Sequence, residues 1–431
     1  MQKFIIALLF FIFSSLTLQG QQITKSTYGD VLLQNATVHT ITKGTLSNTD
    51  VLIADGMIKG VGSNLTSDAI VVDCEGKHIY PGFIDAGTKL GMSEVSSVSL
   101  TNDFDEIGSI IPQMNALTAV NPNAVAIPVT RVNGVTSALA VPTGGLFPGT
   151  AGLINLHGYT PDQMSAGFQA VVFNFPSSGK KGRRDKRSEE DIKKDREKSL
   201  KKIIEVWEEL ALYHLIDSAA IATNSVIGTY QPEMAALLPV YRKEAPLLVN
   251  VNKKEDILEA IKWIDKVGIK AILVGVSEGY KVADEIGKAK LPVIIGPMLS
   301  IPSRASDHYD ISYRAPSILQ KAGVLVALRT DDSENVRNLP FNAGFAATYG
   351  MGVEEALKAI TINPAKMMGV DDKYGSIEEG KVANLFVADG DPFEMKTRLS
   401  HLFINGWNVP IESRHTLLYN EFLDRSPGLK E

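Results

Sequence analysis

Short apolar segments alternate with amphipathic helical segments through the middle of this 431-residue chain, and no other sequence feature constrains the fold as strongly. Four of these apolar segments are 247–250, 271–276, 293–296 and 324–328. They begin about 22 to 31 residues apart, which suits one strand, one helix and two loops per unit. The alternation predicts βα units around a parallel sheet. The span 81–340 is close to the roughly 250 residues of an eight-fold barrel. We therefore expect an α/β fold with a distorted (β/α)8 TIM barrel, although periodicity alone does not exclude a doubly wound sheet.

Both ends of the chain have a different, β-rich pattern. Near the start, apolar runs at 50–54 and 57–62 flank the pair Asp55-Gly56, which is a strong signal for a hairpin turn. Near the other end, the short apolar runs within 383–390 and 402–407 each contain a glycine after the run. We expect the two ends to form one β-sandwich attached to the barrel. The predicted limits are a signal peptide at 1–20, the N-terminal part of the β-sandwich at 21–80, the barrel at 81–370 and the C-terminal part of the β-sandwich at 371–431.

The first twenty residues have the pattern of a secretory signal peptide. Lys3 provides a positive start, residues 4–18 form an apolar run, and the small Gly20 suits a cleavage site. A membrane anchor needs about 20 apolar residues, and this run is shorter. We therefore expect a periplasmic or secreted protein that has no membrane contact after cleavage. The single cysteine, Cys74, cannot form an intrachain disulfide, so the fold must depend on its apolar core.

Charge argues against nucleic acid as a partner. The chain has 43 Lys and Arg against 49 Asp and Glu, for a net charge of -6, and so lacks the basic excess of nucleic-acid-binding proteins. Segment 179–202 departs from this balance, with twelve basic and six acidic residues. We expect a charged insertion at about 177–202, made of a loop followed by a solvated helix face. The alternative is a patch that binds a polyanion.

Three sequence motifs resemble those of a known protein superfamily. They are Tyr80-Pro-Gly-Phe-Ile-Asp85 after the β-rich start, Gly134-Val-Thr-Ser137 at an expected strand, and Gly375-Ser-Ile-Glu-Glu-Gly-Lys-Val-Ala-Asn-Leu385 near the return to the sandwich. They resemble the amidohydrolase superfamily, and the chain is similar to its imidazolonepropionase-like branch over nearly its whole length after residue 20. The resemblance implies a barrel attached to a β-sandwich, and a hydrolase acting on carbon-nitrogen bonds other than peptide bonds.

The resemblance also implies one or two divalent metal ions, such as zinc, which lower the pKa of bound water so that hydroxide forms. This chain carries other residues at the implied ligand positions. Gly87 and Lys89 stand in place of the His-x-His pair after the first barrel strand. Asn155 stands at the anionic position of strand four, and Asn250 and Ser277 replace the histidines of strands five and six. Since glycine has no side-chain donor and an ammonium repels a cation, we expect no metal ligands and no bound cofactor.

Asp331 is the one member of the implied catalytic set that is retained. It follows the apolar run 324–328, where the superfamily has an Asp that passes a proton to the leaving nitrogen. Its spacing to Glu334 also suits a helix cap, and both roles remain open. Because the last strand of a closed barrel adjoins the first, Lys89 and Asp331 should meet at the mouth, with the ammonium replacing the lost metal charge. The alternative is that Lys89 extends into solvent.

The histidines do not supply a replacement ligand set. No two of the seven have the spacing of paired metal ligands. Only His157 and His308 are candidates for the barrel mouth, and a structural or solvent-exposed role suits each of them better.

Two functions are compatible with these residues. The first is an amidohydrolase-related pseudoenzyme or weak enzyme that binds a small polar molecule or an active relative. The second is an active hydrolase of a cyclic amide, imidazolone or peptide-like substrate, with a rearranged or metal-free site. In both, Asp331 and Lys89 would be the catalytic or charged groups, and the neutral side chains at 155, 250 and 277 would bind the ligand. A second copy of the chain or a related amidohydrolase chain is the expected protein partner.

Overall fold

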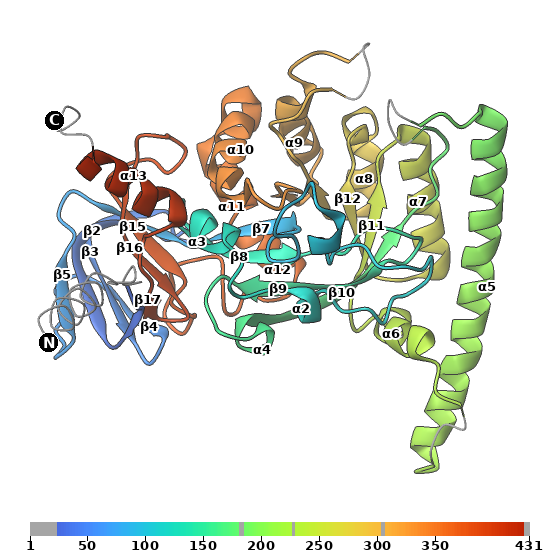
Figure 1. The fold of residues 1–431 in the computed structure, drawn as a ribbon, viewed down its shortest axis with the longest axis horizontal. Helices are drawn as coiled ribbons and strands as arrows, with labels where there is room; N and C mark the ends of the chain where they lie inside the picture. Colours follow the sequence, from blue (N-terminus) through green and yellow to red (C-terminus); the bar gives the residue numbers. More distant parts are fainter. Residues whose placement is uncertain (1–23, 181–184, 226–228, 303–306, 426–431) are drawn as a thin grey trace, which may run out of the picture.

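The computed structural model describes residues 24–180, 185–225, 229–302 and 307–425. The predicted signal peptide at 1–20 lies outside the described residues. Within them, eight strands form a barrel sheet, nine strands form a second sheet from both ends of the chain, and helices surround the barrel (Figure 1). No described helix combines the length and the hydrophobicity needed to cross a bilayer.

The barrel sheet follows the chain order from β7 to β14. Its strands are β7 (Phe83–Thr88), β8 (Val135–Ala140), β9 (Gly149–Asn155), β10 (Ser165–Asn174), β11 (Leu247–Val251), β12 (Ala271–Gly275), β13 (Val293–Ile295) and β14 (Val326–Leu328). Neighbouring strands are parallel except at β9, which is antiparallel to both β8 and β10. Alternate residues such as Leu248, Ile294 and Ala327 form one apolar cluster. This matches the period of two in a strand and places these residues inside the barrel.

Backbone hydrogen bonds bring the last strand next to the first. The N–H of Asp331 donates to the carbonyl of Gly87 at 3.0 Å, and the N–H of Lys89 donates to the carbonyl of Asp332 at 2.9 Å. In a doubly wound sheet the first and last strands would be separated by the other strands. The expected barrel is therefore confirmed, in a distorted and nearly closed form.

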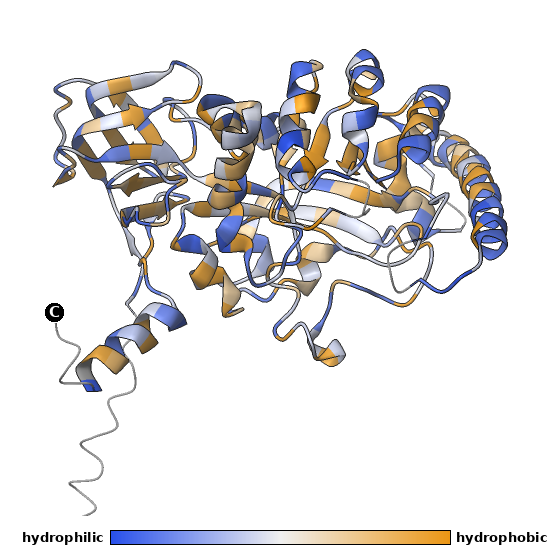
Figure 2. Ribbon diagram, turned by 90° about the horizontal axis from the view of Figure 1, so that it is seen from above, coloured by the Kyte–Doolittle hydropathy of each residue, from blue (hydrophilic) through white to orange (hydrophobic). Residues whose placement is uncertain are grey.

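Helices cover the outside of the barrel, and hydrophilic and hydrophobic residues alternate along them (Figure 2). The described α-helices are α2 (Ala116–Ala119), α3 (Ala126–Arg131), α4 (Pro161–Met164), α5 (Glu189–Ala222), α6 (Pro232–Tyr241), α7 (Lys254–Val267), α8 (Ala283–Ala289), α9 (Ile311–Lys321), α10 (Leu339–Ala346), α11 (Val353–Ala359), α12 (Ile362–Met367) and α13 (Arg414–Arg425). The predicted charged segment leads into α5, which begins with a capping box formed by Ser188 and Asp191. This 34-residue helix lies on the side of the barrel away from the second sheet (Figure 1).

The second sheet joins the two ends of the chain, as expected for the sandwich. Its described strands are β1 (Thr27–Tyr28), β2 (Val31–His39), β3 (Thr45–Ala54), β4 (Met57–Gly62), β5 (Ile70–Asp73), β6 (His78–Pro81), β15 (Leu385–Ala388), β16 (Leu399–Ile404) and β17 (Trp407–Asn408). Strand β15 pairs with β6, which joins residues far apart in sequence. Side chains from both ends, including Val51 and Phe403, share one core. The β3–β4 turn has positive φ at Asp55 and Gly56, which explains the Asp-Gly pair at that point.

Candidate functional site

A cavity of about 930 Å³ lies at the carboxyl ends of the parallel barrel strands. Four of the five residues predicted for the site line this cavity: Lys89, Asn250, Ser277 and Asp331. The fifth, Asn155, is not among the lining residues. The mouth of the barrel therefore brings together most of the predicted set, although their functional roles remain predictions.

Strand alternation explains why polar side chains reach the mouth. Leu248 and Ala327 belong to the inner apolar cluster, so Asn250 and Arg329, two residues further along, also face inward. Asn174 on β10 is in register with Asn250 on β11, and the Asn250 amide donates to the Asn174 side chain at 3.0 Å. The apolar interior thus gives way to a polar layer where the strands end.

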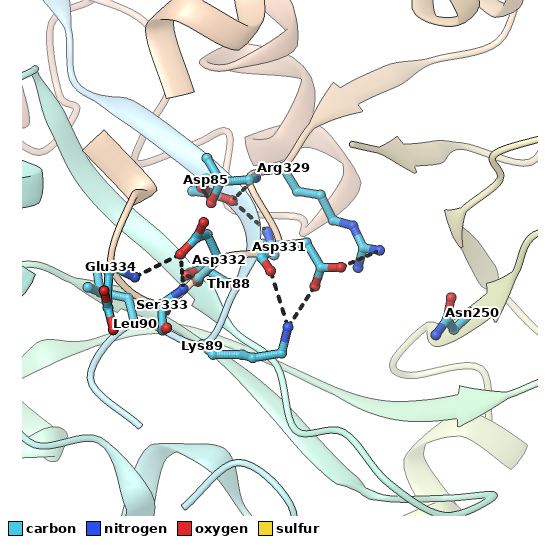
Figure 3. Close-up of polar contacts among 12 residues, drawn as sticks. Asp85, Thr88, Lys89, Leu90, Asn250, Arg329, Asp331, Asp332, Ser333 and Glu334 are labelled. Atoms are coloured by element: carbon cyan, nitrogen blue, oxygen red, sulfur yellow. Dashed lines mark hydrogen bonds and ion pairs between the residues drawn. The ribbon is translucent and has the colours of Figure 1, made fainter. Parts of the chain in front are cut away.

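One carboxylate lies between two cations at the mouth (Figure 3). The Nζ of Lys89 is 3.1 Å from Oδ1 of Asp331 and also donates to the Asp331 carbonyl at 3.2 Å. The Nη2 of Arg329 is 3.4 Å from Oδ2 of the same carboxylate. The proximity expected for Lys89 and Asp331 is thus observed, and Lys89 does not extend freely into solvent.

The turn after the last barrel strand is held by Asp332 and not by Asp331. The Oδ1 of Asp332 accepts hydrogen bonds from the backbone N–H groups of Ser333, Glu334 and Asn335, at 2.7, 2.9 and 3.1 Å. This arrangement leaves the Asp331 side chain to face the cavity. The capping interpretation of the spacing between Asp331 and Glu334 is therefore wrong, since the short 3-10 helix that follows, Val336–Asn338, begins after Asn335 and has no side-chain cap.

Arg329 is a site residue that the sequence analysis overlooked. It is only 8% exposed, yet its side chain donates no hydrogen bond to any described residue, and its Nε is buried without a partner. A Cβ on Gly87 would lie 3.1 Å from Cδ of Arg329, so the glycine provides space for the arginine side chain. The available signal was spacing, because Arg329 precedes Asp331 by two residues on an extended segment.

Asp85 is buried beneath this cluster and was quoted only as part of a motif. Its carboxylate accepts from the backbone N–H of Gly87 at 3.0 Å and from Oγ1 of Thr330 at 2.5 Å. Burial raises the pKa of Asp85 to about 7, against the opposing effects of the Thr330 and Gly87 hydrogen bonds and the Arg329 charge. Asp85 thereby ties β7 to the segment after β14 and positions both sides of the mouth.

Asn155 lies at the opposite end of the barrel, so its expected place at the mouth is corrected. Because β9 is antiparallel to its neighbours, its carboxyl end lies beside Ser137, near the start of β8. The Asn155 amide donates to Tyr374 and Asn405, both at 3.1 Å, and its carbonyl accepts from Ser137 and Asn384, both at 2.8 Å. These four bonds saturate the side chain. The motif did not reveal the direction of the strand.

The two candidate histidines lie away from the mouth. His157 lies near Trp407, with ring centroids 5.5 Å apart, and burial, with a contribution from the Arg131 charge, lowers its pKa to about 4. His308 is exposed and pairs with Asp310 at 2.6 Å. Within the described parts of the chain, no group of three or more His, Cys, Asp or Glu side chains could hold a metal ion.

Comparisons with known proteins agree with the fold and the sequence motifs. Residues 305–411 match the family described as "Amidohydrolase family". An amidohydrolase from Thermotoga maritima MSB8, known from a crystal structure, is 28% identical in sequence to this chain. The two structures superpose with a TM-score of 0.78, over 88% of this chain and 99% of that one. The imidazolonepropionase of Sphingopyxis alaskensis is 34% identical over 87 residues, which are 19% of this chain and 21% of that protein. The probable imidazolonepropionase of Nematostella vectensis is 30% identical over 176 residues, 39% and 38% of the two chains.

These matches and the fold place the chain in the amidohydrolase superfamily. Within it, parts of the chain are similar to several imidazolonepropionases, which supports the imidazolonepropionase-like branch. A dihydroorotase of Caldanaerobacter subterraneus subsp. tengcongensis is also similar, at 55% identity over 42 residues, or 10% of each chain. The match spans less than two thirds of each of these curated relatives, so they do not establish the substrate of this chain.

Proposed function

We propose that this protein binds a small polar molecule in the barrel mouth without a divalent metal, and that metal-dependent hydrolysis is weak or lost. The observation that carries the proposal is the pair of cations, Lys89 and Arg329, on either side of Asp331. These positive groups lie at the end of the barrel where the superfamily resemblance implies a metal site. A metal ion there would be repelled by both of them.

The side chains at the implied ligand positions do not fit zinc. A protein zinc site needs at least three nitrogen, sulfur or oxygen donors arranged around one point. Gly87 offers no donor, Lys89 offers a cation, and Asn250 and Ser277 offer only weak neutral oxygens. Asp331 is a suitable ligand type, but both of its oxygens already contact cationic groups. We therefore derive no catalytic step through a metal.

The cavity suits a small molecule. Its volume of about 930 Å³ lies within the range of ligand pockets, roughly 300 to 1,000 Å³. Its wall combines apolar residues, such as Leu248 and Ile294, with the polar groups of Asn250 and Ser277. We favour a small ligand over an active relative as the occupant, because the cavity is lined by the inner ends of the barrel strands. The signal-like residues 1–20 support secretion or export to the periplasm as part of the same proposal.

Equilibrium dialysis of the full chain against zinc chloride tests the proposal. We expect no stoichiometric zinc, and the same background uptake in Asp331→Ala as in the unchanged chain. Uptake of about one equivalent that is lost in Asp331→Ala would overturn it.

A second candidate is hydrolysis of a cyclic amide, favoured by the imidazolonepropionases and the dihydroorotase among the sequence relatives. Turnover of dihydroorotate or imidazolonepropionate that Asp331→Asn abolishes would favour this alternative. We expect no turnover above the rate of a buffer control.

A further inference from the structure

We infer that the barrel mouth binds a small carboxylate directly, between the guanidinium of Arg329 and the ammonium of Lys89. This inference rests on the proposed metal-free function and adds the chemical class of the ligand. It assigns Arg329 as the main anchor, Lys89 as the second cation and Asp331 as the carboxylate that pairs with both cations and competes with the ligand.

The state of Arg329 is the first reason. A guanidinium has five N–H donors, and buried polar groups in proteins are almost always hydrogen-bonded. Arg329 is 8% exposed and lines the cavity, but within the described residues its only charged contact is Asp331 at 3.4 Å. Its Nε is shielded from the cavity, but the Nη groups make no hydrogen bond to a described residue and remain available to an anion there, which would offset the cost of burying the charge.

The charge balance of the wall is the second reason. The described lining residues include six basic side chains (Lys89, Lys180, Arg187, Arg196, Lys253 and Arg329) and four acidic ones (Asp195, Asp256, Glu278 and Asp331). Three of the acids already have cationic partners: Asp195 pairs with Arg187, Asp256 with Arg196 and Glu278 with Lys281. Among these lining acids only Asp331 faces the two inner cations. Asp85, buried beneath them, is only partly ionised near neutral pH because burial raises its pKa to about 7, so the inner layer keeps a positive excess.

This excess favours a carboxylate over inorganic phosphate. A carboxylate carries one negative charge and can accept two parallel N–H bonds from a guanidinium. Inorganic phosphate carries between one and two negative charges near neutral pH, which is more than a site with a small positive excess balances. Leu248, Val274 and Ile294 add an apolar surface that suits the organic part of a carboxylic acid. Asn250 lies across from the charged cluster and can contact a polar group on that part (Figure 3).

Isothermal titration of the full chain at low ionic strength tests the inference. The probes are N-acetylglycine and benzoate, each compared with its neutral amide, N-acetylglycinamide and benzamide, with inorganic phosphate as a further arm. We expect saturable binding of at least one carboxylate, with at least tenfold weaker binding of its amide and of phosphate. Failure of both carboxylates to bind, or equal binding of acid and amide, would overturn the inference. Phosphate binding tighter than both carboxylates would also overturn it.

Matched variants locate the binding to the two cations. Lys89→Met should weaken carboxylate binding at least tenfold, and Asp331→Asn should strengthen it because a competing carboxylate is removed. Lys358→Met is the control, because Lys358 pairs with two acids on α11 and is 26% exposed, similar to the 21% of Lys89. Lys358→Met should leave binding unchanged. Unchanged binding in Lys89→Met would contradict the assignment.

Arg329→Lys keeps the positive charge but removes the guanidinium. It should weaken carboxylate binding, because an ammonium cannot donate two parallel hydrogen bonds to one carboxylate. Circular dichroism and thermal melting check that each variant is folded. If Arg329→Lys is unfolded, Lys89→Met still decides the question.

The results separate this inference from the proposed function. Neutral amides that bind to a zinc-free protein as tightly as the matching acids would overturn the carboxylate inference and leave the metal-free proposal standing. Stoichiometric zinc dependent on Asp331 would overturn both.

Discussion

The two ends of the barrel both collect polar side chains, but they use them differently. At the base, Asn155 makes all four hydrogen bonds available to its amide, with partners from the barrel and from the segment that returns to the second sheet. At the mouth, the buried guanidinium of Arg329 makes no hydrogen bond to any described residue. A saturated polar network has no capacity left for a ligand, whereas an unsaturated one facing a cavity does. The comparison therefore assigns a structural role to the base and a binding role to the mouth.

The base should be the more sensitive end in stability measurements. Asn155→Ala removes four hydrogen bonds and leaves buried partners such as Ser137 and Asn384 less well satisfied. We expect a loss of about 3 kcal/mol in the free energy of unfolding, since each orphaned buried group costs about 1–3 kcal/mol. Urea denaturation measures this loss. Asn252→Ala at the mouth is the control and should cost less than about 0.5 kcal/mol, because Asn252 is exposed. Equal losses in the two variants would contradict the distinction between the ends.

The mouth can be disturbed by restoring one of the missing histidines. Gly87→His places a Cβ 3.1 Å from Cδ of Arg329 and requires the arginine to move. We expect a loss of about 2 kcal/mol in stability, as for other overpacked sites, together with weaker carboxylate binding. Adding Arg329→Ala should recover part of the stability but none of the binding. Recovery of binding in the double variant would show that Arg329 is not the anchor.

The pH dependence of stability should differ in sign between the ends. At the mouth, burial raises the pKa of Asp85 from 3.8 to about 7. The protonated carboxyl group therefore stabilises the fold fully below about pH 4, and this stabilisation is lost as pH rises through 7. At the base, the pKa of His157 is lowered from 6.5 to about 4, mainly by burial. As pH falls from about 6.5 towards 4, this histidine takes up a proton in the unfolded chain but not in the folded one, so the stability of the fold decreases.

Urea midpoints measured from pH 4.5 to 8.5 test these two signs. Asp85→Asn should remove a fall in stability between about pH 4 and 7. His157 contributes in the opposite direction over nearly the same range, so His157→Gln should make stability fall more steeply as pH rises. The effect of His157→Gln should be partial, because His39 in the second sheet also has its pKa lowered to about 4, by burial and by His78. A profile that keeps its slope in both variants would assign the pH dependence to other groups.

The smallest expected effect is on stability when the Lys89–Asp331 ion pair is broken. The two side chains are 21% and 38% exposed, and partly exposed ion pairs contribute about 0–1 kcal/mol. Lys89→Met should therefore change the urea midpoint little while it weakens carboxylate binding. A loss of more than about 2 kcal/mol would assign this pair a structural role like that of the base network.

The sequence predicts the architecture and part of the site. The alternation of strands and helices and the closure of a barrel were sufficient to expect Lys89 next to Asp331, which lie 3.1 Å apart. The reversed direction of β9 could not be predicted from its apolar run, since periodicity is the same in both directions. Asn155 was therefore placed at the wrong end. Arg329 was overlooked because an arginine after a strand is usually solvated, and only the space beside Gly87 shows why it turns inward.

Calorimetric titration of N-acetylglycine and benzoate, run once with the uncharged chelator 1,10-phenanthroline and once with added zinc chloride, tests the central claim most directly. If the chain's own cations hold the ligand, the dissociation constant of the bound carboxylate will be the same in both conditions. Binding that disappears with the chelator and returns with zinc would show that a metal ion holds the ligand.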